Sequence, residues 1–141
     1  LASLGSAVTL IERSDTMHSL LRDGMEEARQ YGGIHADIIS RMTLIHGDSI
    51  ELLPSLNPEI VLIDPMHPPR KKSALVKGEL REIRQIVGSD SDQLTLIQTA
   101  LATASKRVVL KWPAQASTLE GVKPCSHQII GKSIRFDVFM C

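Results

Sequence analysis

Three acidic residues, Glu12, Asp48 and Asp64, stand at or just after the ends of short apolar runs in this chain of 141 residues. The runs cover residues 7–11, 42–46 and 59–63 and are rich in aliphatic side chains, as buried parallel strands are. Open α/β sheets bind ligands at the carboxyl ends of their strands. The three acids therefore predict a polar ligand site at that edge of a sheet.

The first two acids each have a functional and a structural interpretation. A carboxylate at the position of Glu12 can accept hydrogen bonds from both hydroxyls of a ribose, as in nucleotide-binding folds, or it can cap the next helix or pair with Arg13. Asp48 and Ser49 can accept a hydrogen bond from an adenine amino group, although Gly-Asp-Ser is also an ordinary helix-capping turn. Both alternatives stay open on these residues alone.

The segment Asp64-Pro65-Met66-His67-Pro68-Pro69 is more specific. It is similar to the [Asp/Asn]-Pro-Pro-[aromatic] motif of methyltransferases that modify exocyclic amino groups of nucleobases. Hydrogen bonds from such an amino group to a carboxylate and to a constrained backbone carbonyl make its nitrogen more nucleophilic, and a planar side chain, here His67, stacks on the base. The alternative is a proline-rich loop in which the aspartate caps a turn.

A local excess of positive charge follows this segment, although 16 Lys and Arg balance 16 Asp and Glu in the whole chain. A phosphate backbone beside Asp64 would have to be held there, and a solvated helix face is the alternative. The basic residues are Arg70, Lys71, Lys72, Lys77, Arg81 and Arg84.

Two further residues, Lys111 and Trp112, end the run at residues 107–112 and can border the same pocket. Trp112 is more typical of packing at the end of a strand.

Strand and helix patterns alternate along the chain and define the scaffold. Helices are predicted from Ser14 or Asp15 to Gly32-Gly33 and over residues 50–56, 79–87 and 92–104, with a loop over residues 65–78. Residues 107–112 form another strand, and residues 128–130 and 134–140 form a hairpin. The order predicts one α/β domain with an open, mostly parallel sheet that ends in an antiparallel hairpin.

Composition narrows the class of function. The five histidines and two cysteines lack metal-site spacing, and no nucleophile-and-base arrangement suggests covalent catalysis. No apolar run approaches the roughly 20 residues of a membrane helix, and two cysteines do not encode a disulfide framework, so a cytoplasmic protein is expected. Four aromatic residues are too few for a module that binds single strands mainly by stacking.

Three longer segments closely resemble the ribosomal RNA small subunit methyltransferase J family. They are Ile63–Val87, with its Asp-Pro-Met-His-Pro-Pro and Lys-Ser-Ala-Leu-Val-Lys blocks, Ala104–Pro113 and Gly131–Phe139. The resemblance implies a Rossmann-like class I methyltransferase fold. It also implies transfer of a methyl group from S-adenosylmethionine to the exocyclic amino group (N2) of a guanine in 16S ribosomal RNA, either free or in the small subunit.

The resemblance also assigns roles to residues of this chain. It implies Glu12 and Arg13 at the cofactor ribose, Asp48 and Ser49 beside the adenine, and Asp64, Pro65 and His67 at the target base. The family usually has Phe where this chain has His67. The family's first strand and glycine-rich loop have no counterpart here, so residues 1–141 are expected to be the carboxy-terminal majority of one methyltransferase domain.

Two other functions are weighed against this one. An NAD-type dehydrogenase would use Glu12 for the ribose but gives Asp64-Pro65-Met66 no role. A non-catalytic RNA-binding module would use only the basic residues from Arg70 to Arg84.

The basic segment yields a first testable prediction. Replacing Lys71 and Lys72 by Ala should weaken RNA binding and lower the slope of log affinity against log salt concentration by about one for each lost phosphate contact. Titrations over a salt series measure that slope, and the affinity for S-adenosylmethionine should stay unchanged as an internal control. Unchanged RNA affinity at low salt would contradict the assignment.

Overall fold

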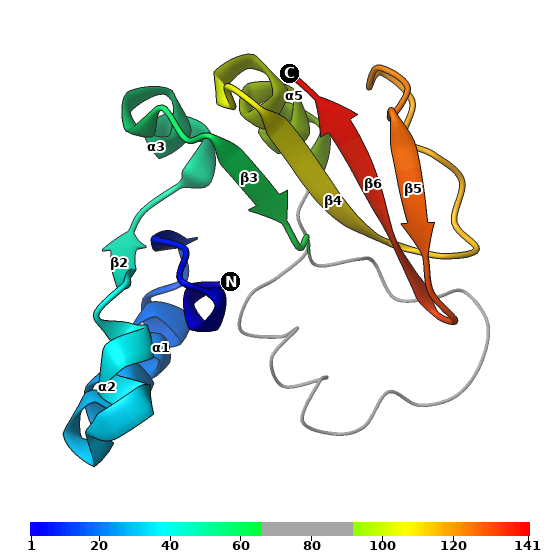
Figure 1. Cartoon of the computed structure of the whole chain (residues 1–141). Coiled ribbons are helices and arrows are strands. Elements are labelled where there is room, and N and C mark those ends of the chain that lie inside the picture. Colours follow the sequence, from blue (N-terminus) through cyan, green and yellow to red (C-terminus); the bar gives the residue numbers. More distant parts are fainter. Residues whose placement is uncertain (66–91) are drawn as a thin grey trace. The chain divides into compact units, whose positions relative to one another are not determined.

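A computed structural model describes residues 1–65 and 92–141 (Figure 1). The chain divides into two compact units, Leu1–Ser49 and Ile50–Cys141, which are described separately. The helix predicted over residues 79–87, and all of the loop predicted over residues 65–78 except Pro65, lie outside the described residues.

The first unit pairs two parallel strands and carries two helices. Its elements are the 3-10 turn η1 (Ala2–Leu4), β1 (Val8–Glu12), α1 (Asp15–Tyr31), α2 (Gly33–Ile39) and β2 (Met42–His46). The register runs from Val8 beside Met42 to Glu12 beside His46, which confirms both predicted strands. The Ser14 hydroxyl accepts a hydrogen bond from the Met17 amide at 3.4 Å, so the predicted cap of α1 is also confirmed.

The helix α2 was not predicted from the sequence. Gly32 and Gly33 have φ angles of 71° and 54°, a region that favours glycine, and they end α1 as expected. A new helix begins at once, packs against α1 and buries Ile39. The glycine pair therefore separates two consecutive helices, and no longer loop follows α1.

The second unit contains a four-stranded mixed sheet. Its elements are α3 (Ser49–Leu56, which begins at the unit boundary), β3 (Ile60–Ile63), α5 (Gln93–Thr103), β4 (Arg107–Pro113), β5 (His127–Ile130) and β6 (Ile134–Met140). Figure 1 shows the strands in the order β3-β4-β6-β5, with β3 and β4 parallel and the later pairs antiparallel. This confirms the predicted parallel strands and terminal hairpin. The described strands are hydrogen-bonded as two sheets, one in each unit.

The core of the second unit forms on the central strand β4. Val108, Leu110 and Trp112 alternate with less buried residues along this strand and are at most 7% exposed. α5 packs against β4, and its Ile97 and Ala100 are completely buried. This alternation fixes the register of β4, because a shift by one residue would turn the apolar side chains out of the core.

A buried ion pair lies on β6. Arg135 and Asp137 are 5% and 4% exposed, and the Arg135 Nε donates to Asp137 Oδ1 at 2.9 Å. Gln128 Nε2 donates to the same carboxylate oxygen at 2.7 Å. The Arg135 Nη1 donates to the carbonyl oxygens of Pro113, Ala114 and Ala116 at 3.2, 3.2 and 2.6 Å. The guanidinium therefore ties the end of β4 and the residues after it to β6.

We expect Asp137→Ala to lower the free energy of unfolding by about 3–5 kcal/mol, because it leaves a buried guanidinium without its counter-charge. Urea denaturation of the purified protein measures the change. Glu26→Ala is the control, since it removes an exposed pair with Arg29 and should cost about 1 kcal/mol or less. Equal effects of the two substitutions would show that the buried pair contributes no more to the free energy of unfolding than the exposed pair.

Candidate functional site

The carboxyl end of the β1–β2 pair brings two of the predicted acids together. Glu12 is the last residue of β1, and its Oε1 accepts a hydrogen bond from the Ser14 amide at 2.7 Å. The Gly47 amide donates to the Glu12 carbonyl oxygen at 3.1 Å, so the chain leaves β2 beside Glu12 and reaches Asp48 in the next residue. The parallel register thus places Glu12 and Asp48 at one edge, as the sequence predicted.

Arg13 interacts with Asp48 at this edge. The Arg13 Nη1 lies 3.8 Å from Asp48 Oδ2, and the two side chains are 39% and 35% exposed. The sequence had offered Glu12 as the surface partner of Arg13, whereas the observed ion pair uses Asp48. An ion pair of this length between partly exposed side chains contributes little to stability. Ser49 follows Asp48 as the first residue of α3.

His46 supports the same edge, a role that the sequence analysis missed. Its Nε2 lies 3.2 Å from Asp15 Oδ1 and 3.3 Å from the Arg13 carbonyl oxygen, and its ring lies 4.8 Å from that of His18. These contacts join the end of β2 to the start of α1 and hold the backbone of Arg13 in place. Only the parallel register brings His46 there, so the spacing of histidines along the sequence gives no signal of it.

Asp64 lies at the carboxyl end of β3, in the second unit. Its Oδ2 accepts a hydrogen bond from Lys111 Nζ at 2.6 Å. Ile63 pairs with Leu110 in the parallel register, so the next residue on each strand, Asp64 and Lys111, meet at the strand ends. Pro65 is buried, which fixes the backbone directly after the carboxylate. The sequence placed Asp64 and Lys111 at the ends of two strands that could border one pocket but did not predict the contact.

Trp112 serves packing, as its sequence context favoured. The side chain is 7% exposed, and the indole Nε1 donates to the Ser117 carbonyl oxygen at 3.0 Å. The remaining predicted site residues lie outside the described residues: His67, Arg70, Lys71, Lys72, Lys77, Arg81 and Arg84.

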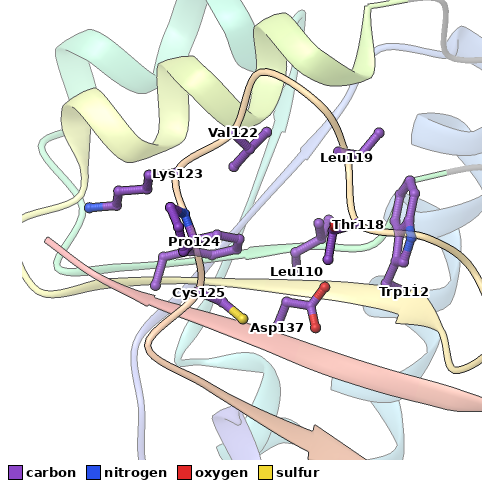
Figure 2. Close-up of a pocket in the computed structure, with 10 residues that line it drawn as sticks. Leu110, Trp112, Thr118, Leu119, Val122, Lys123, Pro124, Cys125 and Asp137 are labelled. Atoms are coloured by element: carbon purple, nitrogen blue, oxygen red, sulfur yellow. The ribbon is translucent and has the colours of Figure 1, made fainter.

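A cavity of about 260 Å³ lies in the second unit between the sheet and the segment of residues 118–125 (Figure 2). Leu110 and Trp112 of β4 and Asp137 of β6 line it from the sheet, and the Cys125 side chain lies beside Asp137. The Asp137 carboxylate is committed to Arg135 and Gln128, so the acid in this cavity is part of the buried ion pair. Asp64 does not line the cavity. The cavity is therefore separate from Asp64.

Among residues 1–65 and 92–141, no three His, Cys, Asp or Glu side chains are grouped as metal ligands. Within the same residues, no helix is long and apolar enough to span a membrane.

Comparison with known families identifies the family of this chain. Residues 1–141 match the profile of a family described as "Putative SAM-dependent methyltransferase". The chain belongs to this methyltransferase family. Its cofactor is accordingly S-adenosylmethionine, and its fold is the Rossmann-like methyltransferase fold.

Named relatives of this methyltransferase are close over nearly its whole length. The protein called ribosomal RNA small subunit methyltransferase J from Agrobacterium fabrum is 59% identical over 140 residues, which are 99% of this chain and 67% of the relative. The protein of the same name from Brucella anthropi is 58% identical, with 99% and 68% covered. The chain spans about two thirds of the length of these relatives.

A solved structure supports the same fold for this methyltransferase. The crystal structure of a SAM-dependent methyltransferase from Neisseria gonorrhoeae is 34% identical and superposes with a TM-score of 0.75. The match covers 99% of this chain and 54% of that one.

Proposed function

We propose that this methyltransferase transfers a methyl group from S-adenosylmethionine to the exocyclic amino group (N2) of a guanine in 16S ribosomal RNA, free or in the small subunit, and that residues 1–141 belong to one methyltransferase domain. The observation that carries the proposal is the identity of 59% and 58%, over nearly all of the chain, to proteins named ribosomal RNA small subunit methyltransferase J. The comparisons do not favour a dehydrogenase or a non-catalytic RNA-binding module. A ribosomal substrate would place the protein in the cytoplasm.

The acids at the end of β1–β2 fit the cofactor by their chemistry. The bond from the Ser14 amide holds the Glu12 carboxylate through Oε1, and the carboxylate can still accept hydrogen bonds from vicinal ribose hydroxyls. We assign Arg13 to the same ribose, and Asp48 with Ser49 to the adenine amino group. When bound, the cofactor supplies a methyl group on a sulfonium centre that is already activated, so the protein chiefly binds and orients.

Asp64 is assigned to the target base. Its carboxylate would accept a hydrogen bond from the guanine amino group, which raises the electron density on the nitrogen that gains the methyl group and then releases one proton. Pro65 restricts the backbone beside it, because the proline ring fixes φ. We assign His67 to stacking on the base, and Arg70, Lys71, Lys72, Lys77 and Arg81 to the RNA phosphates.

The first test concerns Asp64. We expect Asp64→Ala to lower the methylation rate at least about 100-fold, because it removes the side-chain acceptor for the amino protons. Incorporation of labelled methyl groups into small ribosomal subunits or 16S RNA that lack the modification measures the rate. Glu59→Ala is the matched control, since Glu59 lies at the other end of β3 in an exposed ion pair with Lys106. Substantial turnover by Asp64→Ala would refute the role of Asp64.

The second test concerns Glu12. We expect Glu12→Gln to weaken binding of S-adenosylmethionine by about tenfold or more, because hydrogen bonds to a charged acceptor are the strong ones. Calorimetric titration of the purified protein measures the dissociation constant. Glu27→Gln, at an exposed position of α1, should leave it unchanged. Equal affinities of wild type and Glu12→Gln would remove Glu12 from the cofactor site.

A further inference from the structure

Two ion pairs join β3 to β4, among the residues that the structure describes, and they lie at opposite ends of the strands. Lys106 and Glu59 connect the start of these strands at 2.9 Å, with side chains 57% and 68% exposed. Lys111 and Asp64 connect their carboxyl ends at 2.6 Å, with side chains 36% and 56% exposed. Exposed pairs of either kind contribute about 0–1 kcal/mol to stability. A contribution to stability therefore does not explain why a lysine contacts Asp64.

The fold fixes the position of Lys111 firmly. Val108, Leu110 and Trp112 are buried on one side of β4, so Lys111 emerges on the other side. On the flank of β4 away from β3, Lys111 is aligned with Phe136 of β6 in the antiparallel ladder. The ammonium group therefore approaches the Asp64 carboxylate from a strand that is paired on both sides.

We propose that Lys111 is a positioning residue for methyl transfer, a role that rests on the function proposed for Asp64. A carboxylate rotates readily about its Cβ–Cγ bond, because this torsion has broad minima. The short, charge-assisted bond from Lys111 holds Oδ2 and so fixes the plane of the carboxylate. Oδ1 is then left in a defined direction as the acceptor for the guanine amino group. Rate depends steeply on such orientation, since small misplacements of a reacting group slow a reaction strongly.

The test compares kinetics of methyl transfer to small-subunit RNA by the whole protein. Lys111→Met should lower kcat by roughly 10- to 100-fold and change KM for the RNA and for S-adenosylmethionine by less than about threefold. Lys111→Arg keeps a cationic donor and should restore most of kcat. Lys106→Met is the matched control, because it removes the other β3–β4 ion pair, and its kcat should equal that of wild type.

A double-mutant cycle separates an action through Asp64 from an independent one. If Lys111 acts only by orienting Asp64, the variant Asp64→Ala/Lys111→Met is no slower than Asp64→Ala alone. If the two substitutions instead lower the rate independently, so that their fold-losses multiply in the double variant, the proposal is overturned. So would unchanged kcat of Lys111→Met, a raised KM for RNA with kcat intact, or an equal loss in Lys106→Met.

The outcomes also separate this proposal from the function on which it rests. If the wild-type protein methylates the RNA and Lys111→Met is fully active, only the role of Lys111 is overturned. If the wild-type protein transfers no methyl group, or if Asp64→Ala is fully active, the proposed function is overturned and the role of Lys111 with it.

Discussion

The parallel register between β3 and β4 is the constraint on which the chemistry of the second unit depends. It aligns Ile63 with Leu110 and therefore brings Asp64 to Lys111, 47 residues later in the chain. The register is held by the buried alternation of β4, whose central apolar residues would face solvent after a shift by one position. Burial of a few aliphatic side chains thus determines which cation meets the Asp64 carboxylate.

The acids of this protein divide by environment into two kinds. Asp137 is buried and already satisfied by Arg135 and Gln128, and its ion pair anchors the residues after β4. Glu12, Asp48 and Asp64 lie at strand ends where water or a ligand can reach them. A buried carboxylate without its partners would be costly, whereas a carboxylate at a strand end can exchange partners at little cost. The strand-end acids are therefore the ones suited to binding.

Membership in a methyltransferase family agrees with the kind of site that these residues can form. Methyl transfer from an activated donor needs no protein nucleophile and no metal, but it does need groups that hold two ligands in a fixed orientation. The proposed site residues are acceptors and cations of that kind. Glu12 is held by a backbone amide and Asp64 by a lysine, so in both cases the protein constrains one oxygen of a carboxylate.

The sequence by itself determined the local elements: apolar runs predicted all of the strands described, and the acids could be placed at strand ends because a strand ends where its apolar run ends. The resemblance of Asp64-Pro65 and its neighbours to a family motif likewise needed no coordinates. Only the tertiary structure decided that α2 follows the glycine pair, that Arg13 pairs with Asp48, that Arg135 and Asp137 are buried together, and that Lys111 contacts Asp64. These contacts join strands and helices through register and packing, and the spacing of residues along the chain does not encode which strands become neighbours.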